Sequence, residues 1–315
     1  MSKKNRRKPA FSPAPVEPAE KQAAGRVPGG NKPAGQRLRK NRSRPAVLAA
    51  ATIVCAALFL GGGALAAAGN YARQAGAYLQ AGDVQQGLAD LRQACAYNPF
   101  SADYRSELAR LYLAVGQPRQ ALAAAKQAAA RSERSADERA LLAQTYLANG
   151  DYEQAVAHAR RAVELAPYQI AWYETLAGIC ANAGRGELQS GQKEAARRYL
   201  QAALQVPAMI KSRVDGLGAE EKRLWKDAPM LAVTPRVQLY LGEAEYLLGQ
   251  QPQAEKDLQA AAADSGAKGE ALTWLAVLNH RQGREAEAQK LLEQAKAVNK
   301  AYGGMYEQLL KLNVL

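Results

Sequence analysis

Small and apolar residues recur at helical spacing along most of the chain, and short turns interrupt the pattern. In the segment NGDYEQAVAHARRAVELAP, Gly150 is typical of a helix end and Asp151 of the start of the next helix. A stripe of small residues follows on one face of that second helix, at spacings of four and three: Ala155, Ala159 and Ala162. Pro167 then ends the helix. The pattern predicts two helices joined by a tight turn.

The same pattern recurs every thirty-four residues in both directions along the chain. The repeating positions hold a large apolar residue beside a small one, an aromatic residue, a turn glycine and small residues in the second helix. One unit has them at Leu142, Ala143, Tyr146, Gly150, Ala155 and Ala162, and the preceding unit at Leu108, Ala109, Tyr112, Gly116, Ala121 and Ala128. Further units place the turn glycine at Gly82, Gly249 and Gly283. A fixed period of this length indicates stacked helical hairpins.

This pattern resembles the tetratricopeptide repeat family, whose unit is a thirty-four-residue helix-turn-helix. The resemblance implies an all-α fold, a tetratricopeptide-repeat right-handed superhelix of about six units with a C-terminal capping helix. Some positions depart from the family pattern, since Glu245 and Asn279 replace the aromatic residue and Gln74 the large apolar one. We place the units at 68–101, 102–135, 136–169, 170–207, 235–268 and 269–302.

The fourth unit is irregular because its turn glycine occurs twice, as Gly184 and Gly191. The seven extra residues equal two helical turns, so they can lengthen the hairpin and keep its buried face in phase. Pro207 is expected to end the unit. The following stretch fits no unit, and we expect a short helix from about Ala219 to Lys226 within it.

The N-terminal part of the chain differs from the repeats in charge and composition. Residues 1–45 contain thirteen Lys and Arg against two Glu, so +11 of the net charge of +13 lies there. With seven prolines and one aromatic residue, this segment is predicted to be disordered. Residues 46–69 carry no charge, and as a helix they would cover roughly 36 Å, enough for a hydrocarbon core of roughly 30 Å.

A transmembrane helix is therefore predicted at 46–69. Five basic residues lie between Arg37 and Arg44, just before it, and the first charge after it is Arg73, which orients the N-terminus in the cytoplasm and the repeats outside. Two alternatives stay open, a cleaved signal peptide and a soluble helix. The predicted segments are a disordered basic cytoplasmic tail (1–45), the transmembrane helix (46–69), repeat units one to four (70–207), an irregular insertion with a short helix (208–234), units five and six (235–302) and the capping helix (303–315).

We find no catalytic, phosphate-binding or metal-binding motif in the sequence. His158 and His280 lie in different units without a partner at metal-ligand spacing, and there is no nucleophile elbow, phosphate-binding glycine loop or H-E-x-x-H. Cys95 and Cys180 fall in units that are not neighbours, so we expect no disulfide between them. We predict no catalytic residues, no cofactor and no metal, and hence no enzyme.

A binding surface remains, since a stack of hairpins leaves a groove lined by the first helix of each unit. The resemblance implies that a protein or peptide partner binds there, through Leu79, Asp103, Arg110, Leu113, Asp137, Gln144, Leu147, Asn182, Leu239, Glu243, Tyr246, Val277, His280 and Arg281. Leu79, Leu113 and Leu147 are equivalent in three successive units and are expected to form an apolar strip. The alternative is that they only pack against neighbouring helices.

Three hypotheses for function follow. The first is a non-enzymatic protein of the bacterial inner membrane, single-pass, whose extracytoplasmic repeats act as an assembly scaffold or a chaperone-like adaptor. The second is an accessory subunit of a cell-surface polysaccharide system, because the repeats also resemble the tails of bacterial O-antigen ligase and polymerase proteins, with YNPFSADYRSELARLY at 97–112 and YLGEAEYLLGQ at 240–250. The third, an enzyme acting on envelope glycans, lacks a catalytic constellation. The basic tail is expected to contact anionic lipid headgroups, and nucleic acid is not expected because no aromatic residues interleave with the basic ones.

Overall fold

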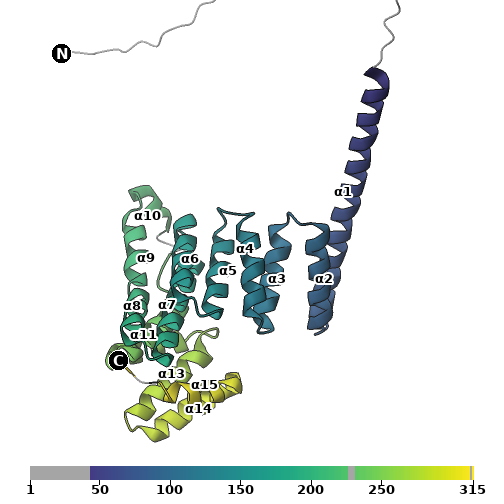
Figure 1. Ribbon diagram of the computed structural model, residues 1–315. Helices are drawn as coiled ribbons and strands as arrows, with labels where there is room; N and C mark the ends of the chain where they lie inside the picture. The colour runs from purple at the N-terminus through teal and green to yellow at the C-terminus, as the bar shows by residue number, and fades with distance from the viewer. Residues whose placement is uncertain (1–42, 226–230, 313) are drawn as a thin grey trace, which may run out of the picture. The chain divides into compact units, whose positions relative to one another are not determined.

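The computed structural model describes residues 43–225, 231–312, 314 and 315, with side chains from Gly61 onward except at Trp225. Every regular element in these ranges is an α-helix, which confirms the all-α prediction (Figure 1). The helices are α1 (Ser43–Gln80), α2 (Val84–Tyr97), α3 (Ala102–Ala114), α4 (Pro118–Ala129), α5 (Ala136–Ala148), α6 (Tyr152–Leu165), α7 (Ile170–Gln189), α8 (Lys193–Leu204), α9 (Val206–Asp215), α10 (Ala219–Trp225), α11 (Pro235–Leu247), α12 (Gln251–Ala262), α13 (Lys268–Arg281), α14 (Glu285–Val298) and α15 (Ala301–Leu310).

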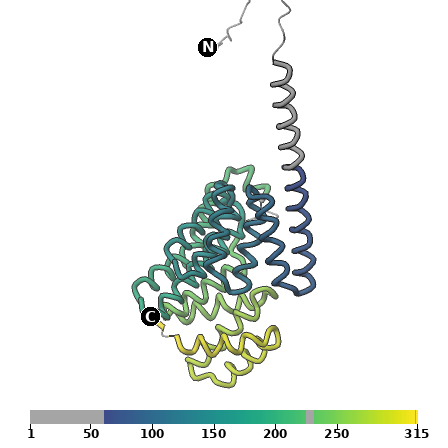
Figure 2. Tube along the Cα trace, turned by 45° about the vertical axis from the view of Figure 1, so that its right-hand side comes forward, coloured from purple at the N-terminus to yellow at the C-terminus, as the bar shows by residue number. Residues whose placement is uncertain are grey.

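Two compact units divide the chain between Val54 and Cys55. Helix α1 begins in the first unit and continues into the second, and all helices from α2 onward lie in the second unit, Cys55–Leu315. Within the second unit, successive helices pair as hairpins: α3 with α4, α5 with α6, α7 with α8, α11 with α12 and α13 with α14. The tube in Figure 2 shows these hairpins stacked in chain order.

These five hairpins and the turn between α1 and α2 each contain a glycine with positive φ, a backbone conformation that residues other than glycine rarely adopt. The six glycines are Gly82, Gly116, Gly150, Gly191, Gly249 and Gly283, with φ between 71° and 83°. All six were predicted as turn glycines, and the prediction is confirmed. Two of the helices that follow these turns start at a side-chain cap: Asp83 accepts from the backbone N–H of Gln86 at 3.1 Å, and Asp151 from that of Gln154 at 3.2 Å.

Small residues let the two helices of a hairpin approach closely. Ala143 on α5 and Ala155 on α6 are fully buried and belong to the same core cluster, as predicted. In the fifth unit Gly242 takes this role, since a Cβ there would lie 2.6 Å from Leu258 Cγ. The core of the stack is thus built from alanine and glycine contacts with leucines filling the remaining space.

The fourth unit differs from the prediction at Gly184 and Pro207. Gly184 is not a turn residue: α7 continues through it to Gln189, and the turn comes at Gly191. A Cβ at Gly184 would lie 2.5 Å from Leu200 Cγ, so this glycine permits close helix packing. Pro207 does not end the unit either, because it lies in the first turn of α9, where its missing N–H has no helical partner to lose.

Within the part of the chain that the structure describes, no helix is long and apolar enough to cross a membrane. Residues 1–42 of the predicted tail lie outside the described residues, and residues 46–60 of the predicted span lie outside those with described side chains. Tail and span therefore stay predictions. Helix α1 itself is unbroken from Ser43 to Gln80, so the predicted boundary at residue 69 falls within one helix.

Helix α15 occupies the predicted capping position and packs against α13 and α14. Leu309 and Leu312 are buried there. Arg281 donates through Nη2 to the carbonyl oxygens of Leu310 and Leu312, at 2.6 and 2.9 Å, and so fixes the end of α15. The final residue donates its N–H to the Leu247 carbonyl at 2.9 Å.

Candidate functional site

Two adjoining hollows lie on the face formed by the first helices of the units. The first, about 360 Å³, is bounded by α5, α7 and α11, and the second, also about 360 Å³, reaches from α5 and α7 to α13 and α15. Leu147 and Asn182 line both hollows, so the two form one groove. We call it the central groove and define it by Gln144, Leu147, Asn182, Arg185, Tyr240 and Glu270.

Glycines on α7 shape the central groove. A Cβ at Gly178 would lie 2.8 Å from Tyr240 Cζ, and a Cβ at Gly186 only 2.1 Å from the Tyr152 hydroxyl. Both tyrosines therefore lie close against the backbone of α7, one from α11 and one from α6. Neither glycine was predicted to shape a binding surface. The sequence does carry a signal for this role, because α7 contains three glycines, and glycine inside a helix usually has a packing reason.

A buried ion pair lies beneath the groove. Arg185 Nη1 is 2.9 Å from Glu243 Oε1, and the Glu243 side chain is fully buried while that of Arg185 stays partly exposed. Burial raises the pKa of Glu243 to about 7, against the opposing effect of Arg185. Burial also raises the pKa of Glu270, although Arg185 and Arg236 act to lower it. The second oxygen of Glu243 has no hydrogen-bond partner among the described residues, so in this part of the chain Arg185 is the group that compensates the carboxyl.

Hydrogen bonds fix the polar groups that line the groove. Asn182 donates through Nδ2 to the Gly178 carbonyl at 2.7 Å, and its Oδ1 accepts from Arg185. Glu174, in the first hollow, accepts from the Thr234 hydroxyl at 2.6 Å. Side chains held in this way need little reordering when a ligand binds, which lowers the entropic cost of binding.

Most predicted groove residues of the first three units are accessible. Leu79, Leu113 and Leu147 are all half-buried, but they differ in surroundings: Leu79 packs against Gly87 of its own hairpin, and only Leu147 lines the central groove. The charged and polar members of these units are exposed: Asp103, Arg110, Asp137 and Gln144. The structure thus brings Gln144, Leu147 and Asn182 together, and the role of the strip in binding stays a prediction.

The groove residues predicted in the last two units do not line the central groove. Four of them are buried inside the stack: Leu239, Glu243, Tyr246 and Val277. His280 is 2.9 Å from Glu285 through Nδ1, and Arg281 is occupied by the carbonyls at the end of α15. Helix α11 explains the burial, because it contacts α7, α8, α12 and α13 and so has partners on several sides. These buried side chains do not reach the groove surface in this structure.

Other reactive side chains show no site. Among the described residues, no group of His, Cys, Asp and Glu is arranged to hold a metal ion. Cys95 and Cys180 are free thiols, and burial raises the pKa of Cys180 to about 12. His158 stacks on Tyr146 with ring centroids 5.3 Å apart, and burial lowers its pKa.

Comparison with known families agrees with the repeat interpretation. Residues 106–170, from α3 to the start of α7, match the family model described as Tetratricopeptide repeat. The same helix-turn-helix geometry continues on both sides of this range. A comparison with curated proteins finds no match. The predicted resemblance to O-antigen ligase tails is tested by none of these findings and stays a prediction.

Solved structures of helical repeat proteins are similar at low sequence identity. PilF of Pseudomonas aeruginosa is 20% identical, with 78% of this chain and 99% of that chain covered and a TM-score of 0.46. PilW, described as a widely conserved type IV pilus biogenesis factor, is 17% identical over 78% and 98%, with a TM-score of 0.49. The Cut9–Hcn1 hetero-tetramer of the APC/C is 17% identical over 78% of this chain and 42% of that chain, with a TM-score of 0.50. At these identities the similarity concerns the fold alone.

Proposed function

We propose that the chain is a non-enzymatic tetratricopeptide-repeat adaptor that binds a segment of a partner protein in the central groove. The observation that carries this proposal is the continuity of the two hollows through Leu147 and Asn182, which together offer a groove across α5, α7, α11, α13 and α15. Both apolar and polar side chains line it, which is typical of surfaces that bind peptide segments through a few side-chain pockets.

Site-specific crosslinking tests the groove. A photoreactive amino acid at Gln144, which is exposed and lines the first hollow, should trap the partner in cells of the native host. The same group at Gln120, exposed on the second helix of a neighbouring hairpin, is the matched control. One dominant product specific to Gln144 supports a scaffold, and many unfolded clients support a chaperone. Equal crosslinking at both positions would contradict binding in the groove.

The adaptor is also anchored in the bacterial inner membrane, in this proposal, by residues 46–69, with residues 1–45 in the cytoplasm and the repeats outside. The uncharged stretch, the basic residues before it and the unbroken helix α1 support the anchor. The tail would contact anionic lipid headgroups on the cytoplasmic side. Protease added to intact spheroplasts should then degrade the repeats and spare residues 1–45. Protection of the repeats would overturn the outward orientation.

A further inference from the structure

An exposed phenylalanine projects from the loop between α2 and α3. Phe100 is 83% exposed, more than any other large hydrophobic side chain that the structure describes, and Tyr97 beside it is 43% exposed. The loop is held in place, since the Phe100 N–H donates to Asn98 Oδ1 at 3.3 Å and Arg131 Nε donates to the Pro99 carbonyl at 2.9 Å. A single exposed apolar side chain is common on protein surfaces. The surroundings of Phe100 therefore decide whether its exposure indicates a contact with another molecule.

The position of this loop along α1 is fixed by aromatic stacking. Tyr97 stacks on Tyr71 of α1, with ring centroids 5.6 Å apart and planes at 12°. Helices α1 and α2 run antiparallel, because Gly87 near the start of α2 lies against Leu79 near the end of α1. The α2–α3 loop therefore lies toward the N-terminal side of α1, next to Tyr71.

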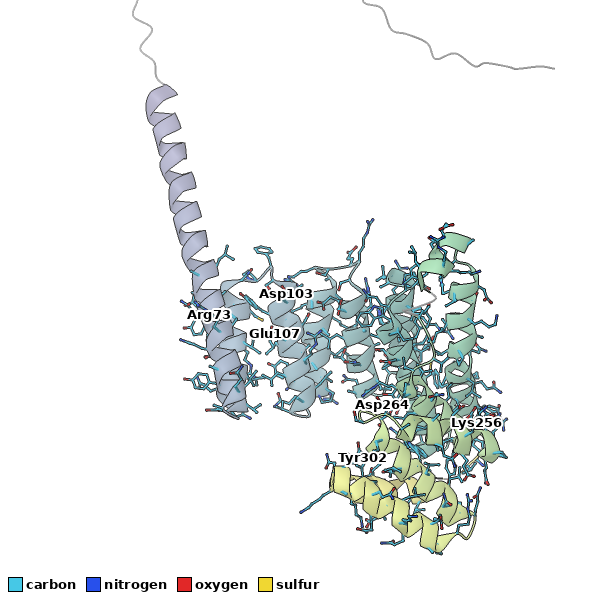
Figure 3. All side chains as sticks on the ribbon, turned by 180° about the vertical axis from the view of Figure 1, so that it is seen from behind. Arg73, Asp103, Glu107, Lys256, Asp264 and Tyr302 are labelled. Atoms are coloured by element: carbon cyan, nitrogen blue, oxygen red, sulfur yellow. The ribbon has the colours of Figure 1, made fainter. Side chains whose placement is uncertain are left out.

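The predicted membrane span ends at the same level. Its last residue, Gly69, precedes Tyr71 by two residues, which is about 3 Å along a helix axis. Arg73 is the first charged residue after it, and Figure 3 shows Arg73 on α1 near the end of the helices where Asp103 begins α3. A bilayer that enclosed residues 46–69 would thus have its surface where Tyr71, Tyr97 and Phe100 lie.

We propose that these three side chains, the aromatic end, lie in the lipid interface, with Phe100 inserted at the boundary of headgroups and acyl chains. The inference rests on the membrane anchor proposed above. Aromatic side chains favour this region of a bilayer, and a second contact beside the anchor holds the first repeat unit against the membrane surface.

Charge plays little part in this contact. Three basic and four acidic exposed side chains lie toward this end of the helices: Arg73, Arg131, Arg134, Asp103, Glu107, Glu133 and Asp137. Their charges sum to −1, so attraction to anionic headgroups is not expected to drive the contact. Insertion therefore occurs equally into zwitterionic and anionic bilayers, unlike the contact expected of the basic tail.

A fluorescence experiment on the full-length chain in phosphatidylcholine vesicles tests the insertion. The vesicles contain a lipid with a nitroxide on its headgroup, and single cysteines carry an environment-sensitive fluorophore. Cys55 and Cys95 are replaced by Ala, whereas Cys180 is kept because its buried thiol is not available for labelling. The label is placed at Pro99, which is exposed in the α2–α3 loop and leaves Phe100 intact, and at Ala114, exposed at the opposite end of α3.

Quenching at Pro99→Cys should exceed that at Ala114→Cys at least twofold, and adding Phe100→Ser should bring it down to the Ala114 level. Undiminished quenching in the Phe100→Ser variant would overturn the insertion of Phe100.

A third label at Leu65→Cys, exposed on α1, separates the insertion of the aromatic end from the membrane anchor. Quenching at residue 65 without an excess at residue 99 overturns the aromatic end and leaves the anchor standing, and a partner protein then becomes the occupant of Phe100. Absence of quenching at residue 65 overturns the anchor and this inference together.

Discussion

Replacement of Arg185 by Met should destabilise the repeat stack in a way that depends on pH. Arg185 donates to Glu243 Oε1 at 2.9 Å, no other partner of this carboxyl is found among the described residues, and Glu243 has no exposed side-chain surface. Met keeps the apolar stem of the side chain and removes the charge. Removing one partner of a buried ion pair leaves the other charge uncompensated, and a buried carboxyl then takes up a proton, so the loss of stability depends on pH.

The ionisation of Glu243 sets the pH at which this cost appears. Burial raises its pKa to about 7 from an ordinary value of 4.5, so in the native protein the carboxyl is protonated at pH 5 and mostly ionised at pH 8. Because the folded pKa lies above the unfolded one, stability from this group is greatest at low pH and falls as pH rises from about 4.5 to about 7. Without Arg185 the pKa rises further and the loss continues to higher pH. Glu270, whose pKa Arg185 also lowers, changes in the same direction.

Thermal unfolding of the full-length protein at pH 5 and pH 8 measures the effect. The fluorescence of Trp274 is a suitable local probe, since this side chain is fully buried with Tyr246 at 5.6 Å. At pH 8, one unit above the native pKa of about 7, ionisation of Glu243 beside Arg185 contributes about 1.4 kcal/mol that a protonated carboxyl in the variant does not have. The variant should therefore lose roughly 3 to 6 °C more in Tm at pH 8 than at pH 5, at roughly 2 to 4 °C per kcal/mol. Glu243→Gln in the same chain is expected to restore most of the loss at pH 8. An equal loss at both pH values, or no restoration, would refute the buried-charge explanation.

Three further predictions concern stability. Ala155→Leu should overpack the contact between α5 and α6 and cost about 1 to 3 kcal/mol in urea unfolding, whereas Ala157→Leu, at an exposed position of the same helix, should have little effect. Gly191→Ala should cost about 1 to 2 kcal/mol because its φ of 78° is unfavourable for a residue with Cβ, and an unchanged midpoint would show that the turn relaxes. Burial and then Asp257 raise the pKa of Glu245 to about 8, so wild-type stability should fall as pH rises from about 4.5 to about 8, and Glu245→Gln should flatten this dependence in a pH series of Tm values.

The hairpin turns could be predicted from the sequence because their cause is local. A glycine with positive φ and the cap after it involve only neighbouring residues, and the period of thirty-four places them in register, as at Gly116 and Gly150. Gly184 was misinterpreted for a related reason. A glycine that permits close packing and a glycine that permits a turn look the same in a single sequence, and only the approach of Leu200 from α8 separates them.

The insertion after the fourth unit shows the limit of proline as a signal. Pro207 stands at the position where the repeat pattern has a helix-ending proline, yet α9 begins at Val206 and carries Pro207 in its first turn. Proline excludes the interior of a helix and is compatible with its start, so one residue supports both interpretations. The short helix expected near Ala219 corresponds to α10, Ala219–Trp225, where two glycines precede it and acidic residues occupy its first turn.

The groove could be predicted only where each first helix keeps one free face. Gln144 and Leu147 reach the central groove because exposed and half-buried positions recur along α5 between the buried ones, and the repeat register then identifies the outward positions. On α11 and α13 the register fails: residues 241–247 and 271–279 are buried without a break, so these helices are enclosed all round. A helix enclosed on every side has no outward face for a periodic pattern to identify. The lining that the later units contribute comes instead from the first two turns of these helices, with Arg236 and Tyr240 on α11 and Glu270 on α13. Which of these turns meet depends on how α7 and α15 pack, and no single repeat contains that information.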